Sequence, residues 1–121
     1  MGDESNVEAV AARFAAYERA LMADQTDALR EFFWPDATRY GTDGNQRSGV
    51  EIDAARHRPH MPADREIHGT LVRSAGSDGV LTETEFTRRS TGAEGRQTQL
   101  WLKRGGEWRV LHAHVSMLPE G

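Results

Sequence analysis

Tyr17 and Arg39 are the two residues whose side chains and positions are most suited to chemistry. Tyr17 recurs with Val10 and Phe14 on one apolar stripe of the first predicted helix, so its ring should be buried and its hydroxyl should need a partner. Arg39 lies in a predicted strand among small side chains. A guanidinium that faces a cavity is costly unless an anion meets it, because its charge cannot be titrated away. If Arg39 faces a cavity, a bidentate grip on a substrate carboxylate is its natural role.

Both residues also have a purely structural interpretation. Tyr17 can be a core tyrosine bonded to a backbone carbonyl, and Arg39 can be solvated or paired with Glu85. Glu83 and Glu85 point the same way from their predicted strand. We predict that Glu85, together with Gln99, completes the pocket and orients Arg39 or a water, and we interpret Glu83 as a structural ion-pair partner.

The remaining candidates are one polar and four ring-bearing side chains. Gln99 and Trp101 share a strand face by alternation, and both are predicted to bind substrate. His57 stands near a helix end, where it is either a surface residue or a contact at the pocket mouth. His112 and His114 share a face, but no third ligand follows at suitable spacing and no His-Glu-x-x-His helix occurs. We therefore predict no metal.

The sequence also lacks the patterns of several other reaction classes. It contains no cysteine, which excludes a thiolate nucleophile, a thiolate metal site and a disulfide framework. Its glycines mark turns rather than a phosphate-binding loop, and no serine stands in a nucleophile elbow. We therefore predict that the protein uses no cofactor.

Length and charge narrow the class of protein. A chain of 121 residues suits one α+β domain, with its core over about residues 7–118. A net charge of −4 and dispersed basic residues argue against a nucleic-acid partner. The acidic N-terminus lacks the order of a signal peptide, and no apolar run approaches the roughly 20 residues of a membrane span. We expect a cytoplasmic protein with no membrane partner.

Apolar periodicity predicts helices in the first half of the chain. The first should end near Met22, with Arg13, Glu18 and Arg19 on the face opposite its apolar stripe. A short second helix should have Thr26 as its N-cap. A strand over Ala37–Thr42, a turn over 43–45 and a third helix over Gly49–Arg58 are predicted to follow.

The second half reads as a four-stranded antiparallel meander broken by glycine-containing turns. The predicted strands are Arg65–Ser74, Val80–Arg89, Arg96–Arg104 and Trp108–Leu118. In the last of these, alternation puts Ala113, Val115 and Met117 opposite Val110. Helices before an antiparallel sheet indicate an α+β fold, in which a strongly curved sheet wraps around the first helix and leaves a conical cavity. Because both sheet faces carry apolar residues, we expect a homodimer to cover the outer one.

Several segments together resemble a known family. The segments that carry the resemblance are Phe14-Ala15-Ala16-Tyr17-Glu18, Phe33-Trp34-Pro35, Thr38-Arg39-Tyr40-Gly41, Gly95-Arg96-Gln97-Thr98-Gln99-Leu100-Trp101 and His112-Ala113-His114-Val115-Ser116. The chain is similar to the AtzH-like (HpxZ-like) family of the nuclear-transport-factor-two-like (SnoaL-like) superfamily. The resemblance implies a cone-shaped fold and a decarboxylating amidohydrolase for a carboxylated urea, with Tyr17 and Arg39 as the active-site pair.

Two alternatives to this function stay open. The first alternative is a non-catalytic module that binds a ligand or assembles with a partner amidase. An isomerase or cyclase similar to ketosteroid isomerase or SnoaL is the other, but the position of the isomerase's general-base aspartate is Gly41 here, beside a cation. A site without that carboxylate suits binding an anion better than removing a proton from carbon.

Overall fold

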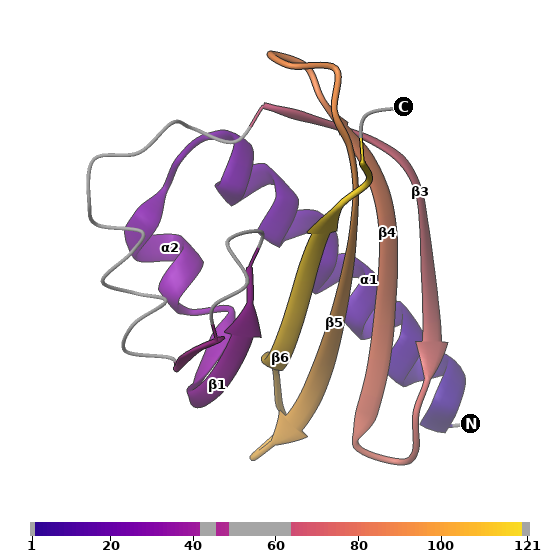
Figure 1. Ribbon diagram of the computed structural model, residues 1–121. Coiled ribbons are helices and arrows are strands. Elements are labelled where there is room, and N and C mark those ends of the chain that lie inside the picture. The colour runs from indigo at the N-terminus through magenta and orange to yellow at the C-terminus, as the bar shows by residue number, and fades with distance from the viewer. Residues whose placement is uncertain (1, 42–45, 49–63, 120–121) are drawn as a thin grey trace.

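A computed structural model describes residues 2–41, 46–48 and 64–119, as one helix-backed curved sheet (Figure 1). The predicted turn over 43–45 and the predicted helix over 49–58 lie outside these residues. No helix in the described part of the chain is long and apolar enough to cross a membrane.

Helix α1 (Gly2–Met22) ends where the sequence predicted. Its buried stripe is formed by Val10, Phe14, Tyr17 and Ala20, at the three- and four-residue steps of one helix face. The chain leaves the helix at Asp24, whose φ of 52° lies in the left-handed region that ends many helices.

The face assigned to Arg13 and Glu18 was wrong. Arg13 packs over the Phe32 ring at 4.3 Å and donates to the carbonyl oxygen of Trp108 at 3.2 Å. Burial lowers the pKa of Arg13, and the nearby Arg109 lowers it further. Glu18 turns toward the sheet and meets a buried arginine, described below. A charged residue on the flank of the apolar stripe can thus face the core when it finds a partner.

Helix α2 (Thr26–Arg30) is one turn long. Its N-cap is Gln25 rather than the predicted Thr26, and no side chain caps it. Leu29 and Phe32 are buried. Strand β1 (Phe33–Tyr40) then begins four residues earlier than predicted and includes Pro35. Its register with β6 shifts between Phe33 and Thr38, the irregular stretch where a proline is tolerated in a strand.

One six-stranded sheet contains every described strand, in the order β2-β1-β6-β5-β4-β3. The remaining strands are β2 (Gln46–Ser48), which was not predicted, β3 (Arg65–Ser74), β4 (Gly79–Arg88), β5 (Glu94–Arg104) and β6 (Glu107–Met117). The meander of β3 to β6 is antiparallel as predicted, whereas β1 joins β6 in parallel.

Helix α1 lies across one side of this sheet and packs on β3, β4 and β6 (Figure 1). We call this side the inner face and the opposite side the outer face. The predicted faces of β6 were partly wrong, because Leu100 pairs with His112 whereas Trp101 pairs with Val110, which leaves Leu111 as a bulge. The extra residue brings Val110 to the same inner face as Ala113, and both are fully buried.

Candidate functional site

A row of side chains crosses the inner face of four neighbouring strands. Thr82 pairs with Gln99, Gln99 pairs with Ala113, and Ala113 pairs with Arg39. Adjacent strands are about 4.8 Å apart, so the backbones of Arg39 and Gln99 are separated by roughly 10 Å. Only the methyl group of Ala113 stands between the two longer side chains in this row.

A second polar row lies beside the first. Thr84 on β4 pairs with Gln97 on β5, two residues from Thr82 and Gln99 respectively. Thr84 is 3% exposed and Gln97 is 4% exposed. Four polar side chains are therefore buried together on the inner face, where a folded core ordinarily has apolar ones.

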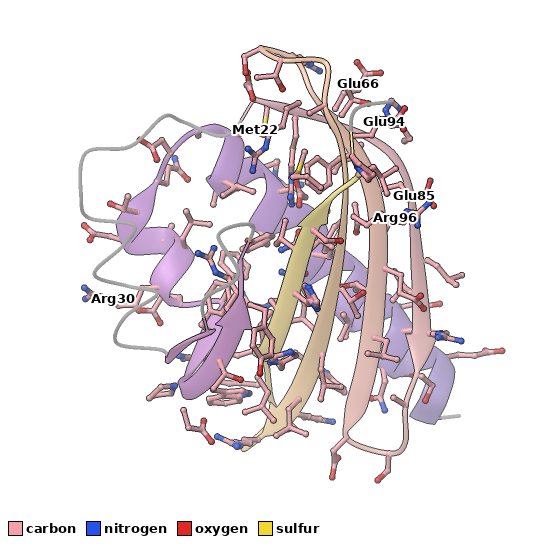
Figure 2. The ribbon with its side chains drawn as sticks, in the orientation of Figure 1. Met22, Arg30, Glu66, Glu85, Glu94 and Arg96 are labelled. Atoms are coloured by element: carbon pink, nitrogen blue, oxygen red, sulfur yellow. The ribbon has the colours of Figure 1, made fainter. Side chains whose placement is uncertain are left out.

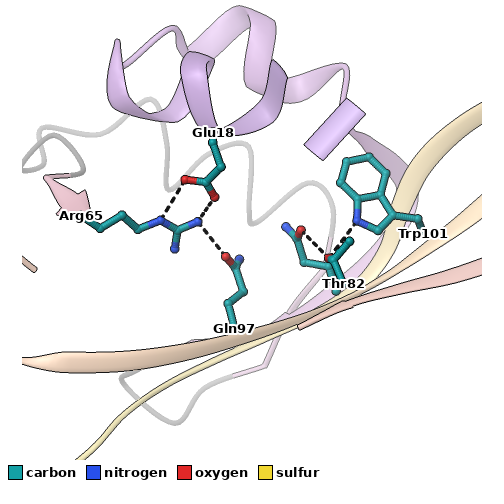
Figure 3. A network of polar contacts seen from close by, with 6 residues as sticks. Glu18, Arg65, Thr82, Gln97 and Trp101 are labelled. Atoms are coloured by element: carbon teal, nitrogen blue, oxygen red, sulfur yellow. Dashed lines mark hydrogen bonds and ion pairs between the residues drawn. The ribbon is translucent and has the colours of Figure 1, made fainter. Parts of the chain in front are cut away.

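The first polar network joins Trp101, Thr82 and Gln99. The indole Nε1 of Trp101 donates to Thr82 Oγ1 at 3.2 Å, and Thr82 Oγ1 donates to Gln99 Oε1 at 3.2 Å. Figure 3 shows the indole of Trp101 turned to the Thr82 hydroxyl on the helix side of the sheet. Because all three side chains are buried, these bonds are shielded from water and hold the side chains in fixed orientations.

The second network joins α1 to the edge of the sheet through Arg65. The Arg65 guanidinium forms a two-point ion pair with Glu18, and its Nη2 donates to Gln97 Oε1 at 2.8 Å (Figure 3). The same guanidinium stacks over the Phe86 ring at 4.7 Å. Only 8% of the Arg65 side chain and 13% of the Glu18 side chain are exposed, so the pair is a buried one and its geometry matters for stability.

Two buried polar atoms beside these networks have no hydrogen-bond partner among the described residues. They are Gln99 Nε2 and Thr84 Oγ1. Buried polar groups in native proteins are nearly always satisfied by protein, water or a ligand. Gln99 Nε2 can therefore donate to a polar molecule on the inner face, and the Thr84 hydroxyl can donate to or accept from one.

Tyr17 lies in an aromatic cluster on the same side of the sheet. Its ring meets Phe32 and Phe33 edge-on, with centroids 5.7 and 6.0 Å away, and Phe14 at 6.4 Å. The residue is 2% exposed. The expectation that the ring is buried is thus confirmed. The structure also places Arg39, half-buried on β1, on the inner face toward which Tyr17 packs.

The structure does not place Glu85 beside the other candidate site residues. It lies on the outer face of β4, where it is 69% exposed at the side chain and pairs with Arg96 at 3.9 Å. Figure 2 shows both side chains at the outside of the sheet. Gln99 and Trp101, by contrast, are on the inner face with Arg39, as strand alternation requires. His57 lies outside the described residues.

The two histidines of β6 also lie on the outer face. The Nδ1 of His112 bonds Thr38 Oγ1 at 2.9 Å, and the Tyr40 ring lies 5.7 Å from both His112 and His114. Among the described residues, no three His, Asp or Glu side chains are placed to hold one metal ion.

Sequence reasoning missed the roles of Arg65, Glu18 and Thr82. The signal that could have found them is the polar alternation of Thr82 with Thr84 and of Gln97 with Gln99. Polar residues at every second position of two adjacent strands mark either a solvent face or a polar interior. The opposite face of these two strands also carries both polar and apolar residues. The sequence therefore could not show which face is buried, and the packing of α1 was needed to decide.

The geometry defines a class of protein, a curved sheet around one long helix with polar groups buried between them. Comparison with solved structures places it among cystatin-like and NTF2-like folds. The chain matches the AtzH-like family over residues 2–121, and it belongs to that family.

Two similar structures are those of a protein of unknown function from Pectobacterium atrosepticum and a cystatin-like fold protein from Burkholderia xenovorans. The first is 39% identical over 94% of this chain and 92% of that chain, with a TM-score of 0.84. The second is 37% identical over 95% and 93%, with a TM-score of 0.84. The association domain of CaMKII from C. elegans has the same fold, with 15% identity over 94% and 97% and a TM-score of 0.73. No curated protein matches the chain.

Proposed function

We propose that the protein binds a small carboxylated urea or amide between α1 and the inner face, and that it acts on this anion as a cofactor-free decarboxylating amidohydrolase. The observation that carries the proposal is the open amide nitrogen of Gln99, fully buried in the same row as Arg39. A cation and a neutral donor on one face suit a carboxylate or carbonyl oxygen. The chain belongs to the AtzH-like family, and the resemblance to that family implies the same substrate class.

The proposed division of roles follows from the side chains. Arg39 holds the carboxylate, and Gln99 donates to an oxygen of the substrate. As the bond from nitrogen to the carboxylate carbon breaks, carbon dioxide leaves and the electron pair stays on nitrogen. Tyr17 donates a proton or a hydrogen bond to the nitrogen or oxygen that gains this charge. Donors fixed in a site that excludes water stabilise such charge better than water does.

An isomerase mechanism has less support. Proton removal from carbon needs a carboxylate base beside the substrate. Among the described residues, the contacts place the carboxylate of Glu18 between α1 and the sheet, and Arg65 already engages both of its oxygens. Glu85 faces outward. The described part of the inner face thus offers cations and amide donors rather than a free base.

Turnover assays with two matched pairs of variants test the proposal. Release of carbon dioxide from carboxylated ureas is measured for wild type, Tyr17→Phe and Arg39→Ala. The controls are Tyr40→Phe, the other tyrosine of the chain, and Arg96→Ala, an arginine on the outer face. We expect Arg39→Ala to abolish substrate binding and Tyr17→Phe to reduce kcat with little change in binding, while both controls stay active.

Three other results would change the assignment. Full activity of Tyr17→Phe removes Tyr17 from the mechanism. Binding of the carboxylated urea without release of carbon dioxide supports a ligand-binding protein instead. Stable co-purification with an amidase, together with an inert inner face, supports an assembly module.

We also propose that a second copy of the chain covers the outer face. On the outer face, Leu71 of β3 is 56% exposed and Tyr40 of β1 is 40% exposed. The half-buried Leu100 of β5 lies on the same face, between these two strands. Exposed apolar side chains on one face of a sheet suit an interface with another protein. The outer face also carries both charge signs, as in the Arg73–Glu83 ion pair on the β3–β4 edge.

In a twofold dimer the same surface of both copies meets, so it must be complementary to itself. The outer face can meet this requirement, because basic side chains of one copy can face acidic side chains of the other. Light scattering should give a dimer mass for wild type and a monomer mass for Leu71→Glu. Met22→Glu, an exposed apolar residue at the end of α1, is the control and should remain dimeric. A monomeric wild type at micromolar concentration contradicts the proposal.

A further inference from the structure

The bond from Trp101 to Thr82 has a fixed direction. An indole N–H can only donate, so Thr82 Oγ1 must be the acceptor of the 3.2 Å contact with Trp101 Nε1. The hydroxyl has one proton of its own, and the contact at 3.2 Å with Gln99 Oε1 is the bond that uses it. Gln99 therefore offers its oxygen to the protein and turns its NH2 group away from Thr82.

Gln97 is oriented in the same way by a different donor. A guanidinium has no acceptor atom, so the 2.8 Å contact with Arg65 Nη2 occupies the oxygen of Gln97. The NH2 groups of Gln97 and Gln99 take no part in these contacts, which use the side-chain oxygens. They come from positions two apart on one strand, and so project from the same face about 7 Å from each other.

We propose that Trp101 and Thr82 are positioning residues that fix Gln99 as a hydrogen-bond donor and so make the site select an oxygen acceptor over an amide NH2 in the ligand. The inference rests on the proposed function, since it concerns the same site. It goes further by naming the residues that set the specificity. Trp101 then acts through the network rather than by touching the substrate.

Burial makes the selection strict. Gln99 is 0% exposed and Thr82 is 1% exposed, so water does not compensate a wrong orientation. A flipped Gln99 would turn NH2 toward Thr82 and leave the hydroxyl proton without its acceptor. A ligand NH2 placed against the fixed Gln99 would bring two donors together, and a site with buried unpaired groups rejects such a ligand strongly.

Binding of a matched pair of probes tests the selection. Malonamate carries a carboxylate and an amide and has a methylene in place of the labile nitrogen of a carboxylated urea, whereas amidinoacetate keeps the same carboxylate and has an NH2 group in place of the amide oxygen. We expect calorimetry to give wild type a preference for malonamate of about tenfold or more. Thr82→Val, which has nearly the same shape but no hydroxyl, should lose most of that preference. Thr82→Ser keeps the hydroxyl and should retain it.

A nuclear magnetic resonance measurement reads the network without any ligand. The indole proton of Trp101, assigned with Trp101→Phe, should exchange slowly in wild type and in Thr82→Ser, and faster in Thr82→Val. Gln99→Glu, which replaces the donor by an acceptor, should fail to bind malonamate while it stays folded. It serves as the second variant if Thr82→Val does not fold.

The outcomes separate this inference from the proposed function. An unchanged probe preference in folded Thr82→Val, or malonamate binding by Gln99→Glu at the wild-type affinity, overturns the inference. Undiminished malonamate binding by Arg39→Ala, with the preference still dependent on Thr82, removes the proposed role of Arg39 and supports the inference. Folded wild type that binds neither probe overturns both.

Discussion

The ion pair between Glu18 and Arg65 should be a major contributor to stability, and Glu18→Gln tests this with little change in shape. The substitution removes the charge that compensates a guanidinium whose side chain is only 8% exposed. Gln97 still accepts a hydrogen bond from Arg65 at 2.8 Å. The charge of Arg65 nevertheless stays buried without a counter-charge among these contacts.

The expected loss is large compared with the stability of an ordinary domain. Removal of one partner from a buried ion pair costs about 3–5 kcal/mol. The lower end applies here, because a glutamine oxygen can still accept one bond from Arg65. A loss of about 3 kcal/mol is a large part of a total of about 5–15 kcal/mol. With a urea m-value of about 1.5 kcal/mol/M, the unfolding midpoint should fall by about 2 M.

The assay is urea unfolding monitored by circular dichroism, with Glu83→Gln as the matched control. Glu83 pairs with Arg73 at 2.8 Å, but the two side chains are 40% and 58% exposed, so the control should lose less than about 1 kcal/mol. The double variant Glu18→Leu/Arg65→Met should recover most of the loss, because apolar replacement of a whole buried pair is often neutral. A midpoint for Glu18→Gln within error of that for Glu83→Gln would refute the reasoning.

Two further predictions concern packing and pH. Gly95→Ala should destabilise the protein by about 1–3 kcal/mol in thermal unfolding, because a Cβ at Gly95 would meet the Phe86 ring at 2.5 Å; Gly69→Ala, where nothing lies within 4 Å, is the control and should have almost no effect. The pKa of Asp36 is held below its ordinary value because Arg104 donates to both of its oxygens, at 2.8 and 3.0 Å. A lowered pKa in the folded state stabilises the protein above the ordinary carboxyl pKa of about 3.9, and this contribution is lost as the pH falls through the lowered value. The melting temperatures of wild type and Asp36→Asn should therefore differ at pH 6 and converge toward pH 2, and a constant difference would contradict the assignment.

The sequence predicted the meander well because its evidence is local. Alternation and glycine-containing turns set the ends of β3 to β6 to within two residues. The parallel pairing of β1 with β6 joins segments far apart in the chain, and no local pattern encodes it. The bulge at Leu111 inverted the predicted face of Val110 for the same reason, since an extra residue in a strand is visible only through its partner.

The candidate site was only half predictable. Alternation correctly grouped Gln99 with Trp101, but it could not tell which side of the sheet α1 covers, so Glu85 was placed in the site although it lies outside. Arg65 was missed because a strand-initial arginine is ordinarily a surface residue. Its burial depends on a carboxylate contributed by α1, 47 residues earlier in the chain.

The polar residues of the inner face have a consequence that connects stability to binding. Arg65 is stabilised by Glu18, Gln97 and the ring of Phe86, and the close packing of that ring requires glycine at position 95. Gln99 Nε2, in contrast, is buried with no described partner, and an unsatisfied buried donor destabilises a fold. A ligand oxygen that meets this donor would remove the penalty only in the bound state. The same feature that weakens the empty protein would therefore strengthen its complex, which is the behaviour expected of a binding site rather than of a hydrophobic core.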